Sequence, residues 1–171
     1  MRFGIPLAIT VFLVCTDVRA QQVPGIDRPT AEVAEQLGSI FQCRMTSGLY
    51  ETGCDNAQVI LDLWRNSARD IFDTAEFTLL IAMRPRQQTP EERATIGAVI
   101  EALAYLAPTW SNSREWLASA IAAAGQQRAC SYIIIDGVVV SIMPLRPVDT
   151  PGRYAEIYVT RNFDIYSLCE Y

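Results

Sequence analysis

The sequence predicts an α+β fold: an N-terminal region of four or five helices, then a three- or four-stranded antiparallel meander, with two disulfides. From about 30 to 125, apolar residues recur at three- and four-residue spacing, which is typical of helices. From about 130 to 169, β-branched runs and strict alternation indicate strands separated by turns. Helices that precede strands in this way are typical of α+β domains. A chain of 171 residues fits one domain.

The first twenty residues resemble a secretory signal. A basic second residue is followed by an apolar run from Phe3 to Cys15, which is too short to span a bilayer. Val18 and Ala20 are small enough for the −3 and −1 positions of a cleavage site. We therefore expect residues 1–20 to be removed, leaving a single mature domain, 21–171, in the periplasm or outside a bacterial cell.

The composition excludes several chemistries. All 14 basic residues are arginine, and the chain has no histidine and no lysine. Histidine-activated nucleophiles, imidazole metal ligands, lysine Schiff bases and the usual phosphate-binding loop are therefore ruled out. Removal of the signal leaves 12 arginines against 18 acidic residues, a net charge of −6. Because an acidic surface repels phosphates, we expect no nucleic-acid partner. We also expect no cofactor, no metal and no transmembrane helix in the mature chain.

Four cysteines remain after the signal: Cys43, Cys54, Cys130 and Cys169. An even number in an exported chain without histidine predicts two disulfides rather than a zinc site. Three pairings are possible. We prefer Cys43–Cys54, because ten residues with Ser-Gly and Thr-Gly turn signals separate them, and Cys130–Cys169, because the two ends of a meander meet at one edge of the sheet. The first bridge would hold the first helix against the second.

Two helices are expected before Pro85. The first begins near Thr30, and the second begins at Asp55 or Asn56 and is deeply buried at its end. Their apolar stripes are Val33, Leu37, Ile40 and Phe41 for the first, and Ile60, Leu63, Trp64, Ala68, Ile71, Phe72 and Ala75 for the second.

The third helix has the clearest start. Thr89 as N-cap, Pro90 at the first helical position and Glu92 two residues later form a capping box, and Pro108 ends the helix.

A fourth helix is expected to begin at Ser111 or Ser113 and to stop at Gly125. Trp110 and Trp116 flank its start. They could line a pocket, but more often such tryptophans fill the gap between two helices.

The strands follow. Tyr132 to Ile135 and Val138 to Val140 are β-branched runs on an Asp-Gly turn, which predicts a hairpin. From Tyr154 to Thr160 the residues alternate, and a last strand is expected from Phe163 to Cys169. One face of the alternating strand would carry Ala155, Ile157 and Val159.

Glu101 is the weak catalytic candidate. On its helix it would share a face with small residues and Tyr105, where a carboxyl could act as a general acid. The ordinary alternative is a solvated or arginine-paired glutamate. The carboxylates Asp62, Asp70, Asp73 and Glu76 could supply a glycosidase pair, but their spacing equally suits a solvated helix face.

Tyr154, Glu156, Tyr158 and Tyr166 are the binding candidates. Tyrosine is a good binding anchor at a surface, so we expect an exposed aromatic stripe on the sheet. The alternative is ordinary cross-strand packing.

No reactive constellation is assembled, so the sequence favours a non-enzymatic, exported binding or accessory protein of the bacterial cell envelope, of inhibitor, immunity or secretion-accessory type. Its partner would be another protein of the envelope or the extracellular space. The alternatives are a small carboxylate hydrolase of envelope glycans and a structural subunit of a surface or secretion assembly. The sequence leaves the oligomeric state open.

Overall fold

The computed structural model describes residues 25–47, 51–55, 58–66, 71–82, 85–127, 130–144 and 155–161. The elements in chain order are η1 (Gly25–Asp27), α1 (Thr30–Phe41), β1 (Thr46–Ser47), β2 (Glu51–Asp55), β3 (Val59–Asn66), β4 (Ile71–Leu79), η2 (Pro85–Gln87), α2 (Pro90–Leu106), α3 (Ser113–Gln127), β5 (Ser131–Ile135), β6 (Val138–Pro144) and β7 (Ala155–Thr160). The expected signal 1–20 and the expected last strand from Phe163 to Cys169 lie outside the described residues.

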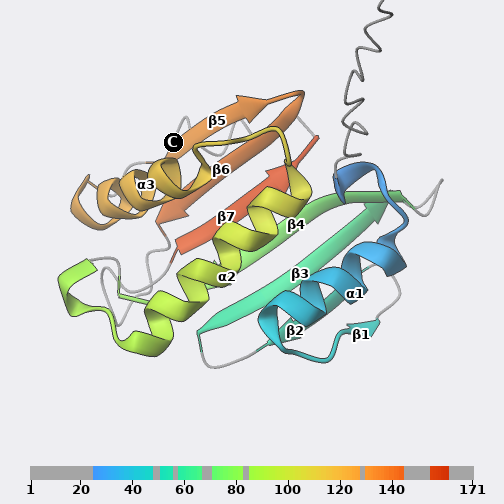
Figure 1. Cartoon of the computed structure of the whole chain (residues 1–171), viewed down its shortest axis with the longest axis horizontal. Helices are drawn as coiled ribbons and strands as arrows, with labels where there is room; N and C mark the ends of the chain where they lie inside the picture. Colours follow the sequence, from blue (N-terminus) through green and yellow to red (C-terminus); the bar gives the residue numbers. More distant parts are fainter. Residues whose placement is uncertain are drawn as a thin grey trace, which may run out of the picture.

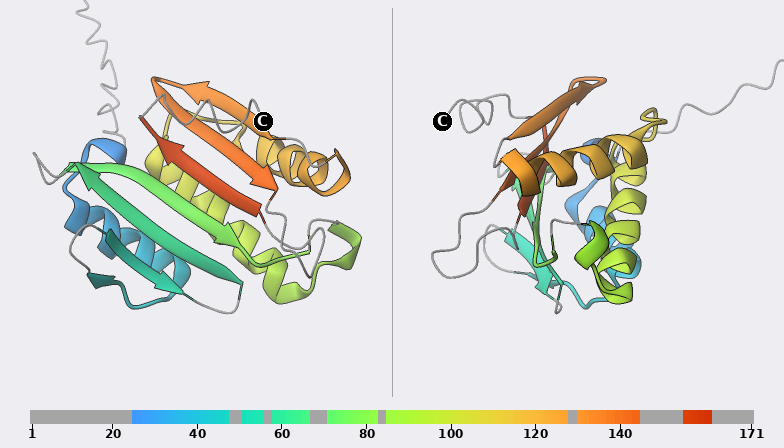
Figure 2. Two further views of the ribbon diagram at one scale, coloured as in Figure 1. Left: turned by 180° about the vertical axis from the view of Figure 1, so that it is seen from behind. Right: turned by 90° about the vertical axis from the view of Figure 1, so that its left-hand side faces the viewer.

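The described strands form one seven-stranded sheet in the order β1-β2-β3-β4-β7-β6-β5, and every neighbouring pair is antiparallel. The β4–β7 pair joins the four strands β1-β2-β3-β4 to the three strands β7-β6-β5. The three α-helices lie side by side on one face (Figures 1 and 2). Helix α1 contacts β2, β3 and β4, α3 contacts β5 and β6, and α2 lies between α1 and α3.

The α+β class is right, but the predicted arrangement is wrong. In place of four or five helices followed by a short meander, the described part of the chain has three α-helices and a sheet built from both ends of the sequence. The expected second helix is the antiparallel pair β3 and β4. In β3, Val59, Leu61 and Leu63 are buried, while Asp62 and Trp64 face the other way. This two-residue period is that of a strand.

The other predicted helices are confirmed. Thr89 accepts a hydrogen bond from the backbone of Glu92, and the Glu92 side chain accepts one from the backbone of Thr89, which completes the capping box of α2. Helix α1 buries Val33, Leu37 and Phe41 as its stripe predicts. The expected stop at Gly125 is wrong, because α3 continues to Gln127.

The predicted hairpin is confirmed as β5 and β6. Asp136 and Gly137 have φ angles of 50° and 78°, so both turn residues are in the left-handed region that a two-residue hairpin turn requires. Thr109 donates a hydrogen bond to the Asp136 carboxylate and so ties this turn to the loop after α2. The predicted alternation of β7 is also confirmed, because Ala155, Ile157 and Val159 are fully buried.

One disulfide, Cys43–Cys54, is described in full, as predicted. It joins the segment after α1 to β2, so the expectation that it holds two helices together is wrong. Cys130 is also disulfide-bonded. Its preferred partner, Cys169, lies outside the described residues, so that pairing stays a prediction.

The core fills the space between the helices and one face of the sheet. Its fully buried side chains include Leu37, Leu61, Leu63, Phe77, Leu103, Leu117, Val140 and Ile157. Within the described ranges, no helix is both long enough and apolar enough to cross a membrane.

Candidate functional site

The sheet face opposite the helices, here called the outer face, is the candidate site. Figure 2 shows this face from behind the sheet and from its edge. Cross-strand register sorts its side chains into three rows that run across the strands. The middle row is Asp62, Glu76, Tyr158, Ser141 and Tyr132; the Glu156 row is Ile60, Thr78, Glu156 and Met143; the Trp64 row is Trp64, Thr74, Thr160, Val139 and Ile134.

Exposed apolar side chains lie on the outer face on β3 and on β5, which β4, β7 and β6 separate in the sheet. Among the described residues, the large hydrophobic side chains that are exposed are Trp64 (43%), Tyr132 (53%) and Ile134 (49%), and all three belong to its rows. Single exposed apolar residues are normal on a protein surface, and it is the position of all three on one face of the sheet that makes this face the candidate site.

The centre of the outer face is a cluster of one tyrosine and two glutamates. The Tyr158 hydroxyl donates to Glu156 Oε2 over 3.1 Å, and it also makes a side-chain hydrogen bond with Glu76. Burial is the main cause that raises the pKa of Tyr158, and the negative charges of Glu76 and Glu156 raise it further. The hydroxyl therefore remains protonated and acts as a donor.

Glu76 is a half-buried carboxyl among like charges. Burial raises its pKa most, the hydrogen bond with Tyr158 opposes that rise, and the charges of Glu156 and Asp62 add to it. Asp62 lies directly across from Glu76 in the register of β3 and β4. Like charges placed opposite each other in a sheet are mutually destabilising, so this position carries an electrostatic cost in the folded protein.

The predicted binding residues fall partly on this site. Glu156 and Tyr158 lie together on the outer face, and both are half-buried rather than fully exposed. Tyr154 and Tyr166 lie outside the described residues. Sequence reasoning missed Trp64 because β3 was predicted as a helix, in which Trp64 belonged to the buried stripe. It missed Tyr132 and Ile134 because the run Tyr132 to Ile135 is apolar at both its outward and its inward positions.

Glu101 does not occupy a groove. It is exposed on α2, on the helix side of the molecule, and Ala94, two turns earlier on the same helix face, is exposed as well. The structure gives no support to a general acid at this position, which would need a partly desolvated pocket. Trp110 and Trp116 pack edge to face with ring centroids 5.3 Å apart, and Trp110 is buried, as expected for residues that fill a gap between helices.

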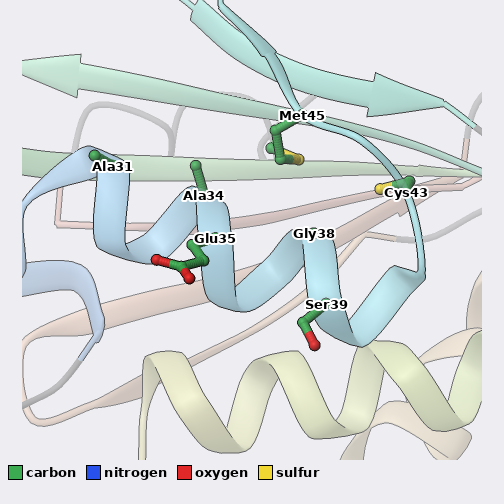
Figure 3. Close-up of a pocket in the computed structure, with 7 residues that line it drawn as sticks. All are labelled: Ala31, Ala34, Glu35, Gly38, Ser39, Cys43 and Met45. Atoms are coloured by element: carbon green, nitrogen blue, oxygen red, sulfur yellow. The ribbon is translucent and has the colours of Figure 1, made fainter.

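A groove of about 470 Å³ lies along α1, between that helix and the chain after it (Figure 3). Its lining is Ala31, Ala34, Glu35, Gly38, Ser39, Cys43 and Met45. A Cβ added to Gly38 would lie only 3.0 Å from Met45 Cγ, so the glycine permits a close approach of helix and loop. The groove is explained by this packing.

Among the described residues, no group of three or more cysteine, aspartate and glutamate side chains is placed to hold a metal ion. Comparison of the chain with protein-family models, with curated proteins and with solved structures found no match.

Proposed function

We propose that this chain is an exported, disulfide-stapled binding protein of the bacterial cell envelope that uses the outer face of its sheet to bind another protein. One observation carries the proposal: the exposed large hydrophobic side chains of the described residues all lie on that face. Aromatic residues are favoured anchors at protein interfaces, since they bury a large area at a small entropic cost.

Two features support export. The sequence begins with a segment of signal-peptide type, and Cys43 and Cys54 form a disulfide. Disulfides persist in oxidising compartments such as the periplasm and are rare in the cytosol. The acidic net charge of −5 for the whole chain supports a protein partner over a nucleic acid.

The experiment is quantitative co-purification from envelope extracts of the source cell. The baits are the tagged mature protein, a Trp64→Ser/Ile134→Ser variant and a Ser119→Ala variant, whose change lies on the exposed side of α3. The proposal predicts a protein that is enriched with the wild-type and Ser119→Ala baits and lost with the double variant. Identical sets of proteins with all three baits would contradict it.

A carboxylate hydrolase of envelope glycans is the second candidate, now centred on Glu76 instead of Glu101. The observation that favours it is that Glu76, whose pKa is raised by burial, lies across from Asp62. Side chains placed directly opposite in a sheet have Cβ atoms roughly 5 Å apart, which is near the carboxyl spacing of retaining glycosidases. This candidate predicts clearing of a cell-wall suspension that Glu76→Gln abolishes. If the wild-type protein does not clear the suspension, this second candidate function is excluded.

A further inference from the structure

We infer that the C-terminal segment, residues 162–171, crosses the outer face of the sheet over β6 and is fixed there by a disulfide between Cys130 and Cys169. The sequence predicts a further strand of the meander in this segment, whereas the structure assigns it the place of a strap across one face of the sheet. Three buried outward side chains, the strand order and the bonded state of Cys130 carry this assignment, which does not depend on the proposed partner.

Three side chains that point away from the helices are buried. Val139 is 1% exposed, Ser141 2% and Thr160 0%, and the register of β6 and β7 places them in the rows of the outer face. Val138 and Val140, which point inward, belong to the core cluster, and Val139 does not. The three α-helices also lie on the opposite face (Figure 2). Another part of the chain therefore covers this part of the outer face.

The burial of outward side chains increases towards the end of β7. Thr160, at that end, is fully buried, whereas Glu156, near the start of β7, is half-buried. On β6, Val139 lies opposite Thr160 and is buried, and Met143 lies opposite Glu156 and is only half-buried. The chain that joins β6 to β7 leaves from the Met143 end, and the C-terminal segment leaves from the Thr160 end. The burial therefore favours the C-terminal segment as the cover.

The strand order leaves no place for the C-terminal segment beside β7. A strand has two sides on which it can form hydrogen bonds with a neighbour. Strand β7 pairs with β4 on one side and with β6 on the other. A meander would continue on one of these sides, and both are occupied. The segment therefore has to leave the line of β7 and pass above the sheet or around it.

Cys130 supplies the second end of the strap. It is disulfide-bonded, and it directly precedes β5. Cys43 and Cys54 are bonded to each other, and Cys15 belongs to the expected signal. In the mature chain, Cys169 is therefore the remaining partner for Cys130. The C-terminal segment is thus tied to the start of β5, while its other end follows directly from β7.

The line between these two ends runs diagonally over β6. Strand β5 starts beside the end of β6, so Cys130 lies two strands from β7 and about four residues along the sheet from its end. At about 4.8 Å between strands and 3.3 Å per residue, the line is roughly 16 Å long. Residues 162–169 reach about 27 Å when extended, which is enough to rise above the sheet. This path passes Val139 and Ser141 and leaves Ile134 on β5 exposed, as the structure shows.

The sequence of the segment fits a cover over an apolar position. Phe163 and Ile165 alternate with Asp164. Because alternate side chains of an extended chain point in opposite directions, Phe163 and Ile165 can both face Val139 while Asp164 faces water. The strap then lies between the exposed parts of the outer face on β3 and on β5.

The test is methyl NMR of the mature protein with a soluble, uncharged gadolinium chelate, which speeds the relaxation of methyl groups that it can approach. In the wild-type protein, the chelate should affect Ile134 strongly and Val139 and Val140 little. Phe163→Ser/Ile165→Ser should uncover the face over β6. The relaxation rate of the Val139 methyls should then rise several-fold towards that of Ile134, while Val140 in the core stays protected.

The matched control is Leu145→Ser/Val148→Ser, which changes two apolar residues in the chain between β6 and β7 and should leave Val139 protected. Cys130→Ser/Cys169→Ser releases the segment with its apolar residues intact and should also expose Val139, which keeps the inference falsifiable if Phe163→Ser/Ile165→Ser fails to fold. Protection of Val139 in both strap variants, an equal rise in the control, or non-reducing peptide mapping that does not find Cys130 bonded to Cys169 would overturn the inference.

Discussion

Glu76 is the residue in which fold and site conflict most. Its carboxyl is half-buried on the outer face, opposite Asp62 and beside Glu156, and it shares one tyrosine proton with Glu156. Proteins tolerate such costs at functional sites, where the group is needed for a ligand rather than for stability.

The raised pKa of Glu76 makes a testable statement about stability. The folded state favours the protonated acid, so ionisation costs stability as the pH rises from the ordinary value through the raised one. Glu76→Gln should therefore stabilise the protein against urea more at pH 8 than at pH 4, where Glu76 is already neutral. Glu101→Gln controls for the loss of one negative charge. The same gain in stability at both pH values would contradict a raised pKa for Glu76.

The Cys43–Cys54 bridge closes a short loop between α1 and β2. In the chain-entropy model, closing a loop of this size is worth about 3 kcal/mol. Replacing both cysteines by serine should lower the free energy of unfolding by about that amount, measured as a shift of the urea midpoint. Ser39→Ala, an exposed change on the same helix, should shift it little. An unchanged midpoint in the double serine variant would show that the bridge does not stabilise the fold.

At the scale of elements, the sequence predicted what local signals specify. The capping box located α2, the Asp-Gly turn located the β5–β6 hairpin, and the alternation located β7. The pair β3 and β4 was mistaken for a helix because Ile60 and Trp64 add apolar residues to the outward face of β3. Those additions obscured the two-residue period and matched a helical stripe. The outward apolar residues of the candidate site are therefore the reason why β3 was predicted as a helix.

Replacing a glycine by alanine is expected to change the free energy of unfolding in opposite directions in α2 and in β2. Gly97 lies inside α2, and a Cβ there would meet nothing within 4 Å. Gly97→Ala should therefore raise the free energy of unfolding by about 0.5–1 kcal/mol, since alanine is the better helix former. Gly53 is in β2, where a Cβ would lie 2.6 Å from the Leu61 carbonyl oxygen. Gly53→Ala should cost about 1–3 kcal/mol through overpacking against β3. Urea unfolding measures both changes, and shifts of the same sign would contradict this account.

At the scale of the whole molecule, no pattern in the sequence indicates the strand pairing that joins the two halves of the sheet. Strand β4 pairs with β7, which joins residues 74–79 to residues 155–160 and makes one sheet from the two halves of the chain. Pairing between distant segments leaves no local periodicity, so pattern analysis could not find it. The same pairing brings Glu76 beside Tyr158 and Glu156. The tyrosine and glutamate of β7 were therefore predictable as candidates, but the cluster that they form was not.

The central claim is that the outer face of the sheet, and not the helical face, meets another protein. Its most direct test is a photo-crosslinking amino acid placed singly at Trp64, Ile134, Glu101 or Ser119 of the full chain in intact source cells. The account predicts covalent adducts with one envelope protein from positions 64 and 134, and none from 101 and 119. Adducts from the helical positions alone, or no adduct from either outer-face position, would contradict it.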